Sequence, residues 1–187
     1  MIATRLAIPE VIAFEPRVFR DARGFFFESF NARAFSEAVG TSIDFVQDNF
    51  SQSARGVLRG MHYQVVHPQG KFVRVTSGEV FDVAVDIRRN SPTFGQWVGE
   101  YLSASNRKAL WIPEGFAHGF LVLSESADFQ YKVTDYWHAE HERCLRFDDQ
   151  DVAIKWPALS SQSTSPLSPI LSDKDRQGTA LHALELL

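Results

Sequence analysis

The stretch VFDVAVDI, residues 80–87, predicts the fold of this chain most clearly. Its apolar side chains Phe81, Val83, Val85 and Ile87 alternate with Val80, Asp82, Ala84 and Asp86. Successive side chains of a strand point to opposite faces, so a period of two predicts a half-buried strand. Turn-forming residues bound the stretch on both sides, in TSGE before it and RRNSPTFG after it.

Similar short segments recur along the chain: LRGMHYQ, KFVRVTS, QWVGEYLS, KALWIP, HGFLVLSE and FQYKVTDYW, separated by turn-prone pieces such as PEGFAHG and SESAD. Closely spaced strands with few helices predict an all-β sandwich or barrel. One helix is expected over residues 31–39, with Asn31 as N-cap, Phe35 and Val39 on one face, and Gly40 at its end. A second helix is expected near the C-terminus, after a Ser/Pro-rich surface loop over residues 158–169.

The length, composition and charge of the chain limit the classes of protein to which it can belong. A chain of 187 residues with 44% hydrophobic content is enough for one core, so a single domain over residues 1–187 is predicted. A net charge of −4 argues against nucleic-acid polymers as partners, and local cations must therefore meet any anionic ligand. No stretch reaches the length of a membrane span, and Pro9 interrupts any signal-like apolar run. The single Cys144 cannot form an internal disulfide, which favours a reducing, cytoplasmic compartment.

Strand parity places two polar side chains in the apolar interior. Lys71 shares a face with Val73 and Val75, and Tyr131 shares a face with Phe129 and Val133. A buried lysine is costly unless it meets an anion or a developing negative charge. The ordinary alternatives are a lysine at the rim with its charge in water and a core tyrosine with its hydroxyl satisfied.

The stretch LRGMHYQ, residues 58–64, raises a question of orientation. Arg59 and His62 point to opposite faces of a regular strand, unless Gly60 marks a bulge that redirects the chain. His62 is also a candidate metal ligand, but the sequence lacks a His-x-His pair, and no carboxylate follows His62 until Glu79. His118 could join it in space, and two imidazoles without a carboxylate make a poor metal site. No metal is therefore expected.

Eight stretches, read together, resemble one family, the dTDP-4-dehydrorhamnose 3,5-epimerases of deoxysugar biosynthesis. They are DARGFFFESF, FVQDNFSQS, GVLRGMHYQ, GKFVRV, GEVFDVAVDIRRNSPTFGQWVG, LWIPEGFAHGFLVLSE, YKVTDYW and LSDKD, in family order over nearly the whole chain. The resemblance implies an all-β, cupin-type jelly-roll and a homodimer. It also implies cofactor-free epimerisation of dTDP-4-dehydro-6-deoxy-D-glucose at carbons 3 and 5, giving dTDP-4-dehydro-L-rhamnose.

This reaction requires three kinds of group. A proton beside a ketone is removable because the negative charge spreads onto oxygen, so a base, an oxyanion partner and an acid are needed. Inversion also requires the base and the acid on opposite faces of the sugar ring. By resemblance, His62 is the base, Tyr131 the acid and Asp175 the carboxylate that orients His62. Lys71 then receives the oxyanion charge.

The same resemblance implies further contacts with the substrate. Its cations are Arg23, Arg59 and Lys174, its polar groups are Glu28, Gln47, Asn49, His118 and Glu142, and Trp137 replaces a tyrosine that stacks on the base. Arg23 and Glu28 belong to an N-terminal arm, within residues 1–50, that crosses to the neighbouring subunit. Structural alternatives exist for three of these pieces: a backbone-bonded turn histidine at His118, a capping box at residues 172–175, and a buried aromatic edge strand in RGFFFE.

The chain departs from the family pattern in three places. Phe50 replaces a histidine, and this replacement is expected to remove a polar group near the sugar. The stretch HAEHERCLRFDDQD lacks the usual proline and glycine, and the loop before LSDKD is longer than usual. These departures leave open whether one carbon is inverted or both. A metal-dependent cupin oxygenase or isomerase and a non-catalytic sugar-nucleotide-binding protein are the other classes considered.

Overall fold

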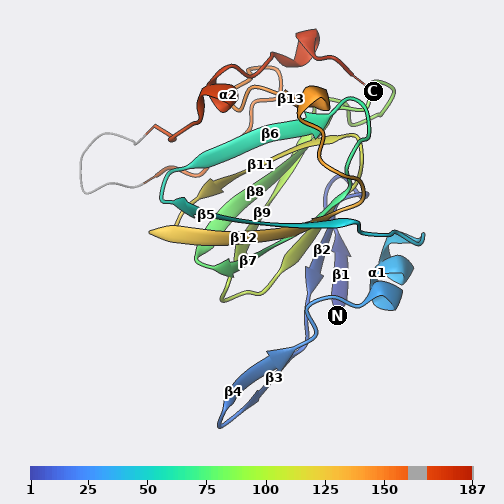
Figure 1. Ribbon diagram of the computed structural model, residues 1–187, viewed down its shortest axis with the longest axis vertical. Coiled ribbons are helices and arrows are strands. Elements are labelled where there is room, and N and C mark those ends of the chain that lie inside the picture. Colours follow the sequence, from blue (N-terminus) through green and yellow to red (C-terminus); the bar gives the residue numbers. More distant parts are fainter. Residues whose placement is uncertain (160–167, 187) are drawn as a thin grey trace.

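Two antiparallel sheets packed face to face form the body of the protein (Figure 1). The computed structural model describes residues 1–159 and 168–186. One sheet has the order β1 (Ile2–Arg5), β2 (Ile12–Glu15), β10 (Ala109–Ile112), β7 (Lys71–Ser77), β12 (Ser126–Val133) and β5 (Gln47–Ala54). The other has the order β13 (Glu142–Cys144), β6 (Leu58–Gln64), β11 (Phe116–Val122), β8 (Glu79–Asp86) and β9 (Trp97–Ser103). The predicted all-β architecture is confirmed.

The main core fills the space between the two sheets. Apolar side chains from both inner faces meet there, among them Val73, Leu110 and Phe129 from one sheet and Ala84 and Phe120 from the other. Burying a Val, Leu or Phe side chain contributes about 1.5–3 kcal/mol, so this interdigitated layer fixes how the sheets face each other. One end of the same layer is polar, and the candidate site lies there.

Strand β8 corrects the expectation of a half-buried strand. Its residues Asp82 and Asp86 are fully buried, at 0% exposure, as are Val83 and Val85 on the opposite face. The reason is a second core on the outer face of this sheet, where the C-terminal segment packs with Leu145, Val152, Leu181 and Leu184 against Phe81, Val83 and Val85. The alternation therefore separates two buried environments, and neither face meets water.

The predicted helix is α1 (Ala32–Val39), and its predicted caps are confirmed. The Asn31 side chain accepts a hydrogen bond from the amide of Ala34, and Gly40 ends the helix in the left-handed conformation. Phe35 is 1% exposed and packs against Phe14, Phe72 and Trp111. The helix thus covers the outer face of the six-stranded sheet.

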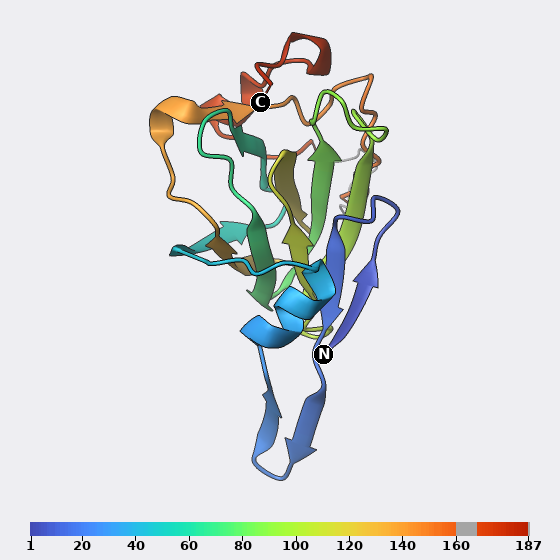
Figure 2. The ribbon, with the colours of Figure 1, turned by 90° about the vertical axis from the view of Figure 1, so that its right-hand side faces the viewer.

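Strands β3 (Val18–Asp21) and β4 (Gly24–Phe27) form a separate hairpin that projects away from the body in both views (Figure 1, Figure 2). Phe19, Phe25 and Phe26 are 50%, 55% and 69% exposed. The expectation of a buried aromatic edge strand is therefore wrong, because no other strand pairs with this hairpin within the described chain.

The C-terminal part contains three short helical turns, η1 (Ala139–His141), α2 (Asp173–Arg176) and η2 (Leu181–Ala183). Much of the expected Ser/Pro-rich loop, residues 160–167, lies outside the described residues. After it, the backbone is anchored where Ile170 bridges to Val57. None of the helices described is long and apolar enough to span a membrane.

Candidate active site

A cavity of about 330 Å³ opens at the polar end of the space between the sheets. Its lining residues come from both sheets and from two adjoining loops: Gln47, Asn49, Ser51, Arg59, His62, Gln69, Lys71, His118, Phe120, Phe129, Tyr131, Trp137 and Glu142. Most of the site residues expected from the sequence are in this list. Its size suits a small organic ligand.

A bulge at Gly60 brings Arg59 and His62 to the same cavity. Strands β6 and β11 pair His62 with His118 and Arg59 with Phe120, so three steps on one strand match two on the other. Gly60 has a positive φ of 137°, and a Cβ atom there would lie 2.5 Å from the Cα of Gly119. Only glycine therefore fits this close approach, and parity alone could not settle the pair.

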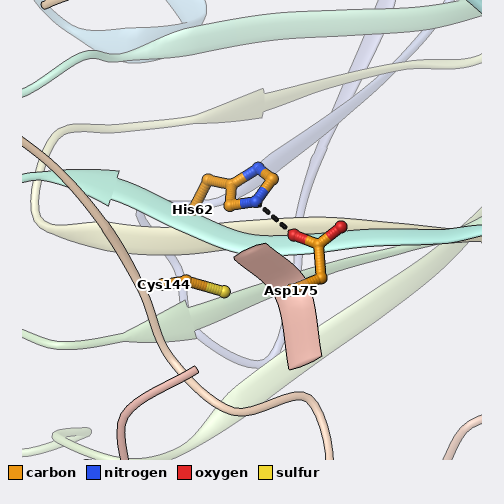
Figure 3. A group of neighbouring side chains, drawn as sticks. All are labelled: His62, Cys144 and Asp175. Carbon is orange, nitrogen blue, oxygen red and sulfur yellow. Dashed lines mark hydrogen bonds and ion pairs between the residues drawn. The ribbon is translucent and has the colours of Figure 1, made fainter. Parts of the chain in front are cut away.

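His62 is held by a carboxylate from the far end of the chain. Its Nε2 lies 2.6 Å from Oδ1 of Asp175, which is 4% exposed in α2 (Figure 3). Burial alone raises the pKa of Asp175, but hydrogen bonds from His62 and Ser172 outweigh it and lower the pKa below its usual value. An ionised carboxylate accepts a hydrogen bond from Nε2–H. The proton of the neutral imidazole is then on Nε2, and Nδ1 keeps a free lone pair.

Asp175 also takes part in the N-terminal cap of α2, at the position of the expected capping box. The Ser172 hydroxyl accepts from the Asp175 amide at 3.2 Å and donates to its Oδ2 at 2.7 Å. Asp175 can therefore take part in the helix cap and orient His62 at the same time, because Oδ2 bonds to Ser172 and Oδ1 bonds to His62.

Cys144 lies beside this pair (Figure 3), and potential ligand atoms of His62, Cys144 and Asp175 lie within 4.8 Å of one another. The Cys144 thiol donates to the carbonyl of Gly60 at 3.3 Å. Burial is the main cause that raises the pKa of this thiol to about 12. The thiol is thus bonded to the backbone, while the two oxygens of Asp175 are bonded to His62 and Ser172.

Tyr131 enters the cavity from β12, in the sheet opposite to His62. Burial raises the pKa of the phenol, the charge of Glu142 raises it further, and Arg59 lowers it in part. The phenol therefore stays protonated at neutral pH and is available as a proton donor.

Lys71, on β7, is 8% exposed and lines the same cavity, as its strand parity predicts. Its ammonium donates to the carbonyl of His62 at 3.2 Å. Burial lowers the pKa of Lys71 to about 8, while the carboxylates of Glu142 and Asp82 oppose that shift. At neutral pH it is still mainly a cation, so the cavity has a positive charge beside His62.

His118 lies within β11 and bonds to a side chain, so the alternative of a turn histidine bonded to backbone is wrong. Its Nε2 lies 3.0 and 2.9 Å from the two oxygens of Asp82 on β8. Burial lowers the pKa of His118 and raises that of Asp82, and the attraction between the two groups opposes both shifts. Asp82 was missed as a site residue because the alternation in β8 assigned it to an exposed face.

A polar network surrounds the cavity mouth. The Glu142 carboxylate accepts from Nε1 of Trp137 at 3.0 Å and pairs with the ammonium of Lys174. Gln47 accepts from the Trp137 amide at 3.3 Å and donates to Asn49 at 2.8 Å. Lys174 thus reaches the cavity edge through Glu142, whose Oε1 lies 4.0 Å from Nδ1 of His62.

Three residues discussed from the sequence lie apart from this cavity. Arg23 sits in the hairpin, bonded to Asp21, and Glu28 accepts from Asn31 at 3.1 Å. Phe50 is 63% exposed on the face of β5 opposite to Asn49, so the expected loss of a polar group near the sugar is wrong for this cavity. Ser51, Gln69, Phe120 and Phe129 line the cavity and were missed. Ser51 was detectable, because it continues the period of two from Gln47 and Asn49.

An imidazole oriented by a carboxylate, facing a protonated phenol across a jelly-roll cavity, defines an acid–base enzyme that moves protons. A family model described as dTDP-4-dehydrorhamnose 3,5-epimerase matches residues 5–183. The chain belongs to this family of sugar-nucleotide epimerases, which are isomerases. The predicted family, cupin-type jelly-roll fold, epimerase function and enzyme class are confirmed.

Three relatives illustrate the similarity. A dTDP-4-dehydrorhamnose 3,5-epimerase from Pseudomonas aeruginosa is 65% identical over 180 residues, covering 96% of each chain. The crystal structure of dTDP-6-deoxy-D-glucose-3,5-epimerase from Legionella pneumophila in complex with dTDP-4-keto-L-rhamnose is 50% identical, has a TM-score of 0.92, and covers 98% of this chain and 94% of its own. A 3'-monoepimerase from Streptomyces bikiniensis, in complex with dTDP-quinovose, is 32% identical with a TM-score of 0.85, covering 95% and 86%.

Proposed function

We propose that this cavity binds dTDP-4-dehydro-6-deoxy-D-glucose and epimerises it at carbons 3 and 5 with His62 as base and Tyr131 as acid. The observation that carries the proposal is that these two side chains line one cavity from opposite sheets. Inversion needs this arrangement, because a proton returned from the side that it left restores the original configuration.

His62 removes the proton through Nδ1, the nitrogen that Asp175 leaves free. The electron pair of the broken C–H bond moves into the ring and onto the ketone oxygen as an enolate. Asp175 stabilises the imidazolium that forms, since a charge-assisted hydrogen bond strengthens as positive charge develops. The negative charge of Asp175 therefore stabilises His62 most strongly when His62 has taken up the proton.

Lys71 meets the negative charge on the enolate oxygen, and Tyr131 donates a proton to carbon from the other face. The ammonium of Lys71 is in place beside His62 before the reaction, which avoids reorganisation when the charge appears. Tyr131 then becomes a phenolate and His62 an imidazolium, and exchange with solvent restores both. The same cycle at the second carbon completes the reaction.

The nucleotide part of the substrate is matched by the rim of the cavity. Arg59 and Lys174 supply cations for the diphosphate, which a chain of net charge −4 must provide locally. The Trp137 side chain is 55% exposed and offers a flat face for thymine. His118, Gln47, Asn49 and Glu142 complete the polar contacts to the ligand.

We also propose a homodimer in which the β3–β4 hairpin reaches the cavity of the neighbouring subunit. Its exposed aromatic side chains support this proposal, and so does the position of Arg23 and Glu28 away from their own cavity. Strands β1 and β2 and helix α1 pack on their own sheet, so the crossing arm is narrower than residues 1–50. The chain is then one domain, residues 1–187, with this arm and a C-terminal segment from about residue 157. A cytoplasmic location agrees with its single free cysteine.

Epimerisation at a single carbon is the second candidate, because the similar 3'-monoepimerase shares the fold. The test is to incubate the protein with dTDP-4-dehydro-6-deoxy-D-glucose in heavy water and to locate deuterium by NMR. Deuterium at carbons 3 and 5 of an inverted product is expected. Deuterium at one carbon alone supports the monoepimerase, and its absence from both rejects the proposed function.

A metal-dependent isomerase is disfavoured because the donors beside His62 are already engaged: Cys144 bonds to the backbone, and Asp175 bonds to His62 and Ser172. Turnover is therefore expected to be unchanged after treatment with a strong chelator. A loss of kcat at saturating substrate that added metal restores contradicts the mechanism above.

A further inference from the structure

A second cluster of potential metal ligands lies outside the catalytic residues described above, close in the chain to the cavity residues Gln69 and Trp137. It consists of His67 from the loop between β6 and β7, Asp135 and His138 from the segment after β12, and His141 in η1. One ligand atom from each of His67, Asp135 and His138 lies within 4.8 Å of the others. Nitrogen and oxygen donors gathered in this way are typical of sites for Zn²⁺ and similar ions.

The distances are close to those of a coordination sphere. Nδ1 of His67 lies 3.2 Å from Oδ2 of Asp135, and two ligands of a tetrahedral zinc ion lie about 3.4 Å apart. The His67 and His138 rings stack with centroids 4.8 Å apart and 27° between their planes. The His141 ring lies 6.0 Å from His67 and 5.8 Å from His138. The donor atoms of His67, Asp135 and His138 are therefore near enough to one another to hold one ion.

The backbone beneath the cluster is fixed by a buried side chain. Gln64 is 3% exposed, and its Nε2 donates to the carbonyls of His67 at 2.6 Å and Tyr136 at 3.2 Å. Its Oε1 accepts from the amide of His138 at 2.6 Å. One amide group thus joins both loops, so the imidazoles are positioned before any ion arrives.

We propose that His67, Asp135 and His138 form a binding site for a divalent transition metal ion such as Zn²⁺, with water or His141 as a further ligand. Mixed imidazole and carboxylate donors favour zinc, cobalt or nickel over magnesium or calcium. The side chains of His67 and Asp135 are 50% and 37% exposed, so an ion can enter from solvent.

The site also bears on the cavity, because Trp137 lies between Asp135 and His138 in the sequence. An ion bound there ties the loop of His67 to the segment of Trp137, the side chain of which lines the cavity. The stretch HAEHE that departs from the family pattern supplies two of the imidazoles, His138 and His141. The structure therefore gives this departure a chemical role.

The test is calorimetric titration of the whole protein with ZnCl₂. One ion per chain is expected to bind to the wild type, and at least about tenfold weaker binding is expected for His67→Gln and for His138→Gln, since each removes a ligand. Two control variants are expected to bind Zn²⁺ as the wild type does. Asp175→Asn changes a residue of the group His62, Cys144 and Asp175, and His182→Gln changes a histidine that belongs to neither group. Circular dichroism checks that each variant is folded.

Unchanged affinity in both His67→Gln and His138→Gln overturns the proposal, as does loss of binding in Asp175→Asn or no binding to the wild type. A second readout concerns the backbone: ZnCl₂ is expected to slow amide hydrogen exchange over residues 135–141 in the wild type and not in His138→Gln. Equal exchange rates with and without ZnCl₂ contradict the proposed link between the two loops. Neither measurement depends on the reaction proposed for the cavity.

Discussion

The imidazole of His62 and the carboxylate of Asp175 lie 2.6 Å apart, although 113 residues separate them in the sequence. Asp175 is on the single turn α2, and that turn is capped by the same Ser172 that bonds its second oxygen. The orientation of the proposed base thus depends on how the C-terminal segment docks on the five-stranded sheet.

Replacing Asp175 by Asn is expected to lower kcat by about ten- to a hundredfold, since a charge-assisted hydrogen bond contributes about 1.5–3 kcal/mol. Steady-state kinetics measures this loss. Asp173→Asn is the matched control: it changes a carboxylate on the same turn that is 91% exposed and pairs with Arg176, and its kcat is expected to stay near the wild-type value. Wild-type turnover in Asp175→Asn means that the carboxylate does not act on His62.

The pH profile is expected to report Lys71. Because burial lowers the pKa of Lys71 to about 8, its positive charge is present below that pH and is lost as the pH rises through it. We expect kcat/KM to fall above about pH 8, as the enolate loses its cation. In Lys71→Met the rate is low and this fall disappears. The control Lys132→Met alters a lysine that is 32% exposed, lies outside the cavity lining and pairs with Asp48, and it is expected to keep the wild-type profile. A flat wild-type profile across pH 8 contradicts the role of Lys71.

Two variants of the β3–β4 hairpin test dimer formation and substrate binding separately. Phe26→Ser removes a side chain that is 69% exposed and is expected to weaken the proposed dimer, as measured by sedimentation velocity. Arg23→Ala is expected to leave the dimer intact and to raise KM by about tenfold or more, through loss of a cation on the diphosphate. A monomeric wild type with full activity rules out the crossing arm.

The bulge in β6 is expected to tolerate no side chain at Gly60. Gly60→Ala places a Cβ 2.5 Å from the backbone of Gly119, at a φ of 137°. We expect a loss of about 1–3 kcal/mol in the free energy of unfolding, measured by urea denaturation. Gly24→Ala is the matched control, because Gly24 has a similar φ of 132° with no atom within 4 Å of the added carbon. Equal losses in the two variants would show that backbone strain alone explains the effect.

Local periodicity predicted the parts of the site that depend on a single strand. It placed Lys71 and Tyr131 toward the interior, and both line the cavity. It failed at Asp82, because the more apolar face of β8 packs under the C-terminal segment, and the face of Asp82 turns to the space between the sheets, where Asp82 meets His118.

Features that depend on contacts between distant segments could be predicted only from the resemblance to the family. The joint orientation of Arg59 and His62 depends on how β6 pairs with β11. The contact of Asp175 with His62 depends on the path of the C-terminal segment, and strand parity carries no information about that path.

The most direct test of the central claim is Tyr131→Phe incubated with substrate in heavy water and followed by NMR. If His62 and Tyr131 act on opposite faces of the ring, the base still exchanges the proton that it removes, and inversion falls by about 10²–10⁴-fold. Deuterium is expected in recovered substrate of unchanged configuration. Inverted product formed by Tyr131→Phe at the wild-type rate would contradict it.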